Sequence, residues 1–248
     1  MTTKTNPTLV EHLIELRQRL IRAVVVTLLF FSVLAYFAND IYTQIAQPLM
    51  SVMPQGTGMI ATDVAAPFFA PFKLAFMLSI ILAFPYILHQ IWSFIAPGLY
   101  KHEKRFAAPI LISSVVLFYG GIAFAYFVVF PLVFAFFTSV APEGITIATD
   151  ISSYLDFVLK LFIAFGIAFE VPVVVFILCW AGVTNVANLK EKRPYIIVGA
   201  FVIGMLLTPP DVISQTLLAV PMWMLFELGL LMAKMVDKPE VEEVSSES

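Results

Sequence analysis

The chain has 248 residues, of which 60% are hydrophobic and only 12% are charged, and its mean hydropathy is +0.95. A soluble fold of this size could not bury so much apolar surface, so the composition excludes a soluble globular protein. The formal net charge of −3 carries little information, because the charged residues are grouped between long apolar segments. The fold class we predict is an all-α, polytopic membrane protein.

Six apolar segments are candidates to cross a hydrocarbon core about 30 Å thick. They cover residues 23–38, 73–95, 108–137, 157–180, 195–207 and 212–233. The third lies in a charge-free stretch too long for one upright helix, which predicts a tilt or a bend near Gly120, Gly121 or Pro131. The fifth would rise only about 20 Å at 1.5 Å per residue. We therefore expect a shortened fifth helix, with the sixth as a second candidate for shortening.

Two further segments have their own patterns. Leu9, Leu13, Leu16 and Leu20 form one helical stripe, which predicts a short amphipathic helix along the headgroups before the first span. The prolines and glycines of residues 47–72 favour turns over a long helix. We expect residues 1–233 to form a single transmembrane domain. The acidic, serine-rich segment 234–248 is expected to be a disordered cytoplasmic tail.

The basic residues predict the orientation, because cytoplasmic loops carry the excess of lysine and arginine. Twelve of the fourteen fall in the N-terminal segment, in the loops after the second and fourth predicted spans, or after the last span. Only Lys73 and Lys160 lie toward the other face. Both termini are therefore predicted to be cytoplasmic, and the opposite face is acidic.

The sequence offers little for metal or covalent chemistry. Cys179 is the only cysteine, and the three histidines are scattered, so we expect no intramolecular disulfide, no metal site and no cofactor. An intramembrane hydrolase would need a nucleophile with a base or paired acids, and the H-E-x-x-H and G-x-S-x-G motifs are absent. We expect no catalytic residues, no enzyme activity and no nucleic-acid partner.

Three separated motifs, "HLIELRQRL" at 12–20, "FIAPGLYKHEKR" at 94–105 and "KRPYIIVGAFVIGMLLTPPDVISQ" at 192–215, resemble the TatC family, the multi-spanning component of the twin-arginine protein translocase. The resemblance implies a receptor in the bacterial inner membrane that binds the signal peptides of folded proteins. It also implies an oligomeric complex in the lipid bilayer with the single-span subunits TatA and TatB. The driving force in the family is the proton motive force.

The resemblance also implies a signal-peptide site. Two arginines present planar guanidinium groups that prefer bidentate carboxylate partners. The implied residues are Glu15, Arg17, Phe94, Lys101 and Glu103. Each also has a plainer interpretation. Glu15 could pair with Arg19 one helical turn away, which would contribute about 0.3–0.5 kcal/mol; Glu103 could balance its basic neighbours; and Phe94 could be an interfacial aromatic.

Glu170 lies near the middle of the fourth predicted span, where a charge is rare unless it faces a wet cavity or has a partner. The family places an acid on a concave polar pocket there. A protonated carboxyl that is hydrogen-bonded to a neighbouring helix is the open alternative.

For partner helices, the resemblance implies a surface on the predicted periplasmic side and the ends of the fifth and sixth spans. Its residues are Pro48, Met205, Thr208, Asp211 and Gln215. A simple helix-ending turn at 208–211 would also account for part of this pattern.

A second function class stays open on the residues alone. A proton-coupled secondary transporter would explain Glu170 and Asp211. The sequence lacks the pair of matching interrupted spans that marks an inverted repeat, which argues against a transporter.

Overall fold

The computed structural model describes residues 9–52, 58–95, 104–140, 149–208 and 212–235. Within these ranges the chain is helical and contains no strand, only one isolated bridge between Ile60 and Asp150. The elements are α1 (Leu9–Leu34), the 3-10 turn η1 (Ala35–Phe37), α2 (Ala38–Val52), α3 (Ala66–Ile95), α4 (Lys104–Phe124), the π-helix η3 (Ala125–Val129), α5 (Phe130–Val140), α6 (Ile151–Ala168), α7 (Val171–Trp180), α8 (Val186–Glu191), α9 (Arg193–Leu207) and α10 (Val212–Ala233).

Within the described residues, five helical stretches are long and apolar enough to cross a membrane. They are Leu13–Gln47, Ala66–Phe94, Ala108–Phe137, Ile151–Trp180 and Val212–Ala233. The predicted fifth span is the shorter apolar helix Arg193–Leu207. The protein is therefore a multi-pass, all-helical membrane protein, as the composition predicted. The sixth crossing and the orientation of the termini stay predictions.

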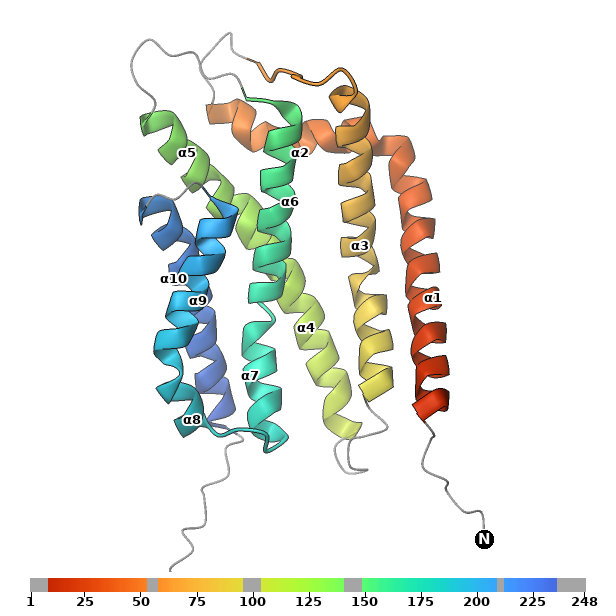
Figure 1. The fold of residues 1–248 in the computed structure, drawn as a ribbon, viewed down its shortest axis with the longest axis vertical. Coiled ribbons are helices and arrows are strands. Elements are labelled where there is room, and N and C mark those ends of the chain that lie inside the picture. Colours follow the sequence, from red (N-terminus) through yellow and green to blue (C-terminus); the bar gives the residue numbers. More distant parts are fainter. Residues whose placement is uncertain (1–8, 53–57, 96–103, 141–148, 209–211, 236–248) are drawn as a thin grey trace, which may run out of the picture. The chain divides into compact units, whose positions relative to one another are not determined.

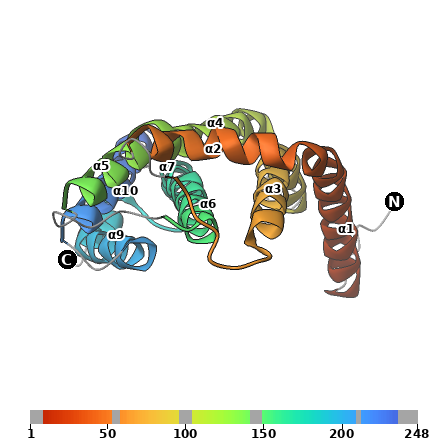
Figure 2. The same ribbon diagram turned by 90° about the horizontal axis from the view of Figure 1, so that it is seen from above.

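The chain forms two compact units, Met1–Ala164 and Phe165–Ser248, and the boundary falls inside α6. In the first unit α1 and α3 lie side by side, and α2 runs crosswise to both (Figures 1 and 2). The aromatic pair Phe31 and Phe76 joins α1 to α3, with ring centroids 5.7 Å apart.

The predicted separate amphipathic helix is wrong, because α1 runs without a break from Leu9 to Leu34. No proline or glycine lies between the leucine stripe and the first span, so nothing ends the helix there. The stripe residues Leu13, Leu16 and Leu20 are 65%, 47% and 63% exposed. The leucine stripe is therefore part of the exposed surface of one long helix, α1.

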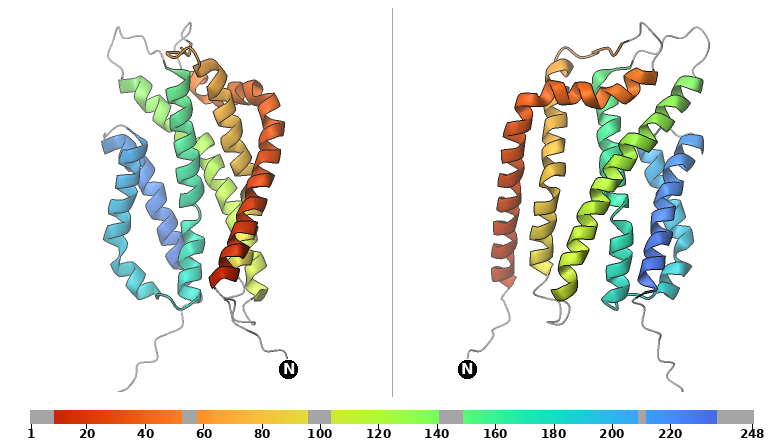
Figure 3. Two further views of the ribbon diagram at one scale, coloured as in Figure 1. Left: turned by 45° about the vertical axis from the view of Figure 1, so that its right-hand side comes forward. Right: turned by 180° about the vertical axis from the view of Figure 1, so that it is seen from behind.

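The segment expected to form turns is helical at both ends, since α2 extends through Pro48 to Val52 and α3 begins at Ala66. Three tyrosine hydroxyls tie α2 to its neighbours: Tyr126 donates to the carbonyl of Gln44 at 3.1 Å, Tyr154 to that of Ile45 at 2.7 Å, and Tyr42 to that of Ile151 at 3.2 Å. These bonds, made by residues distant in sequence, hold a proline-containing helix across the ends of α5 and α6 (Figure 3).

The helix of the long third segment is irregular directly before Pro131, one of the three positions at which a bend was predicted. Pro131 has no N–H and cannot donate to the carbonyl of Phe127, four residues earlier. The helix widens into the π-helix Ala125–Val129 directly before it, and the N–H of Phe130 donates to the carbonyl of Ala125. Figure 3 shows α4, η3 and α5 as one rod that runs obliquely to α3.

The fourth predicted span is two helices, α6 and α7, separated at Phe169 and Glu170. Pro172 supplies the reason, because its missing N–H leaves the carbonyl of Ala168 without its helical partner. The amide of Glu170 donates instead to the carbonyl of Ile167, in a tighter turn. The break places Glu170 directly before the first residue of α7.

The second unit packs α7, α9 and α10 around small residues. Val175, Cys179, Phe226 and Leu230 belong to its buried core. At Gly229 of α10, an added Cβ would lie 2.9 Å from the Cα of Pro172. The backbones of α7 and α10 therefore come close together at this glycine, as small residues allow at helix interfaces in membranes.

Candidate functional site

Glu15 and Arg19 form an ion pair one turn apart on α1. The Nε and Nη2 atoms of Arg19 both donate to Oε1 of Glu15, at 3.0 and 2.5 Å. The Arg19 side chain is 20% exposed and that of Glu15 is 37% exposed. No described residue donates a hydrogen bond to the other carboxylate oxygen of Glu15, Oε2. The carboxylate therefore holds one guanidinium and keeps an acceptor open.

Arg19 also connects α1 to the end of α3. Its Nη2 donates to the carbonyl of Ser93 at 3.1 Å. This carbonyl lies in the last turn of α3, where the helix leaves carbonyls without intrahelical partners and a cation is favourable. The neighbouring Phe94 is half-buried, and Arg17 is exposed on α1. The structure thus brings Glu15, Arg19 and the segment carrying Phe94 together.

At the other end of the first unit, Asp150 joins two distant segments of the chain. It accepts hydrogen bonds from the amide and hydroxyl of Thr62, at 3.0 and 2.9 Å, and from the amide and hydroxyl of Ser153, at 2.9 and 3.1 Å. Asp150 thereby caps the start of α6. The bonds from the Ser153 and Thr62 amides hold the pKa of this carboxyl below its usual value.

In the second unit, α9 and α10 come close at Gly204 and Gln215, where an added glycine Cβ would lie 3.3 Å from the Gln215 carbonyl oxygen. The hydroxyl of Thr208 donates to the carbonyl of Gly204 at 3.0 Å, and its side chain is buried. Met205 is 49% exposed, and Gln215 is half-buried. Met205 is thus exposed on the surface of α9, whereas Thr208 is not.

Two acids of the second unit have different surroundings. Glu170 is half-buried at the break before α7. Glu227 of α10 accepts a hydrogen bond from Nη2 of Arg193 at 2.6 Å, which ties α10 to the start of α9. No local sequence pattern indicates this pair, because the two residues are 34 positions apart. In the described ranges, no three or more His, Cys, Asp or Glu residues gather as a metal site would require.

Residues 11–221 match the family model described as "Sec-independent protein translocase protein (TatC)". The chain belongs to the TatC family. The proteins named TatC from Haemophilus influenzae and Escherichia coli K12 are 63% and 58% identical to it. The alignments cover 91% of this chain and 88% of the first relative, and 94% of this chain and 91% of the second.

A solved structure titled "Crystal Structure of Twin Arginine Translocase Receptor- TatC" superposes with a TM-score of 0.81 at 39% identity, covering 91% of this chain and 99% of that one. The resemblance found in the three motifs is thereby confirmed. The chain is a component of the twin-arginine, Sec-independent protein translocase, a transport family rather than an enzyme family. The secondary-transporter alternative is not favoured.

Among the residues that the TatC resemblance implied, the structure describes some and leaves others out. Glu103, Lys101 and Asp211 lie outside the described residues, and of Pro48 only its place in α2 is described. Sequence reasoning treated the Glu15–Arg19 pair as an alternative to a binding site. It missed the bond from Arg19 to Ser93, which no local pattern could reveal because it joins residues 74 positions apart.

Proposed function

We propose that this chain is the translocase subunit that receives twin-arginine signal peptides of folded proteins at the cytoplasmic face of the bacterial inner membrane. Glu15 and Glu103 accept the two guanidinium groups of the signal. Arg17, Phe94 and Lys101 line the same surface, with Phe94 against apolar parts of the peptide. The family match supports the translocase role, and the assignment of these residues is our own.

The observation that carries the proposal is the state of Glu15. Its carboxylate already holds a guanidinium, so the local geometry suits the group that the signal would bring. Both donor atoms of Arg19 bind Oε1 of Glu15. The other oxygen, Oε2, accepts no hydrogen bond from the described residues and can accept one from an arginine of the signal peptide. A carboxylate can accept at both oxygens.

Arg19 competes with a signal arginine for the carboxylate of Glu15. A signal arginine can bind Oε2 beside Arg19 or replace Arg19, which retains its bond to the Ser93 carbonyl. A charge-assisted hydrogen bond contributes about 1.5–3 kcal/mol when sheltered, but Glu15 is more than one third exposed, so solvent screening reduces this. A single pair would bind weakly. The proposal therefore needs both Glu15 and Glu103.

The remaining parts of the proposal follow the TatC resemblance. The single-span subunits TatA and TatB dock at the α9–α10 end of the second unit, where Met205 is exposed, and Pro48 and Asp211 contribute on the same predicted periplasmic side. Glu170 contributes an intramembrane polar position. The complex is oligomeric, and the proton motive force drives export. An uncoupler should accordingly stop export while cellular ATP is maintained.

Site-specific photo-cross-linking from a twin-arginine signal to the membrane-embedded chain tests the site. Glu15→Gln keeps the shape of the side chain but loses the charge, and should lower the cross-linking yield about tenfold. Glu103→Gln should do the same. Glu191→Gln, an exposed acid at the end of α8, is the matched control and should bind normally.

A signal with two lysines in place of the arginines gives the second comparison. Lysine is a point charge without the planar fork, so wild type should bind it more weakly than the arginine signal. This preference should shrink in Glu15→Gln. Unchanged cross-linking of the arginine signal to Glu15→Gln and Glu103→Gln would refute the carboxylate–guanidinium assignment.

A further inference from the structure

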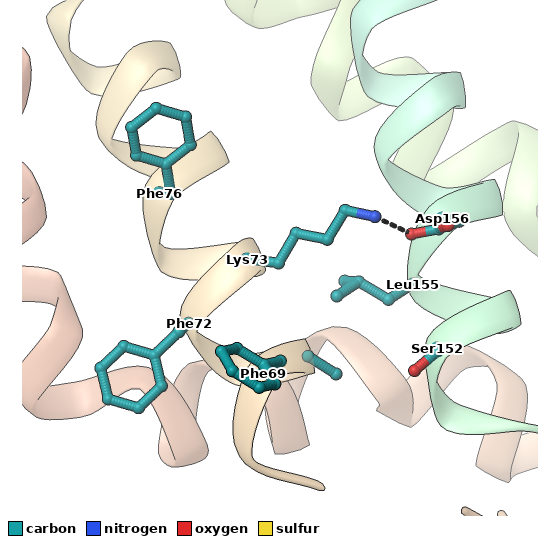
Figure 4. Close-up of a pocket in the computed structure, with 8 residues that line it drawn as sticks. Phe69, Phe72, Lys73, Phe76, Ser152, Leu155 and Asp156 are labelled. Atoms are coloured by element: carbon teal, nitrogen blue, oxygen red, sulfur yellow. Dashed lines mark hydrogen bonds and ion pairs between the residues drawn. The ribbon is translucent and has the colours of Figure 1, made fainter. Parts of the chain in front are cut away.

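A hollow of about 480 Å³ lies in the first unit between the first turns of α3 and the first turns of α6. Its walls are apolar on the α3 side and carry one cation and one anion. The residues that matter here are Phe69, Phe72, Lys73 and Phe76 on α3, with Leu155 and Asp156 on α6. Figure 4 shows Lys73 extending from α3 across the hollow to Asp156.

The charge pair in this hollow is open to its surroundings. The Nζ of Lys73 donates to Oδ1 of Asp156, and the two side chains are 56% and 46% exposed. An ion pair this exposed contributes little to folding. The ammonium has three donors and the carboxylate has two oxygens, so each partner retains capacity for a second bond. Stability alone therefore does not account for a cation and an anion in an apolar wall.

The depth of the pair suits the polar boundary of a bilayer. Lys73 lies seven residues after the start of the apolar stretch Ala66–Phe94, and Asp156 five residues after the start of Ile151–Trp180. At 1.5 Å per residue these positions are about 10 Å and about 8 Å along their helices. The headgroup region on each side of the hydrocarbon core is about 5–8 Å thick. Both charges are thus within reach of lipid phosphates, toward which lysine side chains extend.

The rest of the wall suits acyl chains. Phe69 is 63% exposed and Phe76 is 45% exposed, although both are large and apolar. Phe76 lies about one turn deeper along α3 than Lys73 and faces hydrocarbon, whereas Phe69 lies one turn nearer the start of the helix, beside the headgroup region. The hollow therefore joins a pair of opposite charges, at headgroup depth, to an apolar surface that continues along α3.

We propose that this hollow binds one phospholipid whose headgroup carries both a phosphate and a primary ammonium, as phosphatidylethanolamine does. Lys73 binds the phosphate, and Asp156 accepts hydrogen bonds from the ammonium. The glycerol region fills the hollow, and an acyl chain lies along Phe76, which is deeper in the membrane than Lys73. Because both residues lie in the half of the membrane away from the basic loops, the lipid comes from that leaflet. The site is separate from Glu15 and does not depend on signal binding.

Charge complementarity gives the site its selectivity. An anionic lipid without the ammonium satisfies Lys73 but places uncompensated negative charge beside Asp156, which is unfavourable. A trimethylated headgroup carries the positive charge but has no N–H to donate to the carboxylate. The order of binding should therefore be phosphatidylethanolamine, then phosphatidylcholine, then phosphatidylglycerol.

Native mass spectrometry of the full chain, released from nanodiscs that contain equal amounts of these three lipids, measures the order directly. Wild type should retain one phosphatidylethanolamine in preference to the others. Asp156→Asn should lower that preference over phosphatidylglycerol about tenfold, as expected for one lost charge-assisted bond. Lys73→Gln should lower retention of all three. Lys190→Gln on α8 and Asp40→Asn on α2 change exposed charges that do not line the hollow and should behave as wild type.

A second variant leaves both charges in place. Ser152→Trp fills the hollow from the first turn of α6 and should displace the lipid, with the thermal midpoint in lipid-free detergent unchanged. A photo-cross-linker at position 152 should yield a lipid adduct. A protein adduct instead, from a second copy or a single-span helix, would overturn the proposal. So would equal retention of the three lipids by wild type, or loss of retention in Lys190→Gln equal to that in Lys73→Gln.

Discussion

The close approach of α7 and α10 gives a stability prediction that can be worked from distances. In Gly229→Ala, the new Cβ would lie 2.9 Å from the Cα of Pro172 and 3.0 Å from the Cβ of Val175. Ordinary van der Waals contact begins near 3.4 Å, so one helix must move by several tenths of an ångström. The neighbour at 2.9 Å is backbone, which cannot rotate away. Adding a methyl group to such a packed contact costs about 1–3 kcal/mol.

Two other glycines provide a matched series in the same unit. In Gly204→Ala the added Cβ would lie 3.3 Å from the Gln215 carbonyl oxygen, which is a smaller steric conflict. In Gly199→Ala the added Cβ would meet no atom within 4 Å. All three lie within helices, where alanine is favoured over glycine by up to about 1 kcal/mol in water. The expected order of stability is Gly199→Ala at or above wild type, then Gly204→Ala, then Gly229→Ala.

The assay uses Cys179, the only cysteine in the sequence, which is 6% exposed in α7 beside α10. Labelling of its thiol by a maleimide dye during heating in detergent reports the separation of these helices. For a chain of this size, a loss of 1 kcal/mol lowers the midpoint by about 2–4 °C. Equal midpoints for Gly229→Ala and Gly199→Ala would refute the packing of α10 on α7.

Three further predictions address other parts of the protein. Asp150 has a lowered pKa, so its stabilising bonds are fully formed above the unfolded value of about 3.9 and are lost only as the pH falls through the lower folded value. Hydrogen exchange of the Ile60 and Ile151 amides, corrected for intrinsic rates, should show constant protection from pH 7 down to about 4 and a loss at every pH in Asp150→Asn. A reporter fused after residue 145 should be periplasmic and one after 188 cytoplasmic, and a cytoplasmic signal from 145 would contradict the six-span topology. A cysteine at Met205 should cross-link to a TatA or TatB helix and one at the buried Thr208 should not; labelling of Met205 by lipid probes alone would exclude docking there.

Several features of the fold could be predicted because they depend on local chemistry. Continuous apolar runs defined the spans, and α10 covers residues 212–233 as expected. The missing N–H of Pro131 marked the position of the π-helix in the third segment. The division of the fourth predicted span into α6 and α7 was not predicted, because hydropathy continues unchanged across residues 157–180.

The sequence by itself determined the class, the family and the positions of the charged residues, since composition, hydropathy and three motifs require no knowledge of contacts. Tertiary structure decided what each charged residue touches. Glu15 with Arg19 follows from helical spacing, but Arg19 with Ser93, Lys73 with Asp156, and Arg193 with Glu227 join residues 74, 83 and 34 positions apart. The physical reason is that hydropathy and helical periodicity act over a few residues, whereas partners across helices are selected by how the helices pack, which no local pattern encodes.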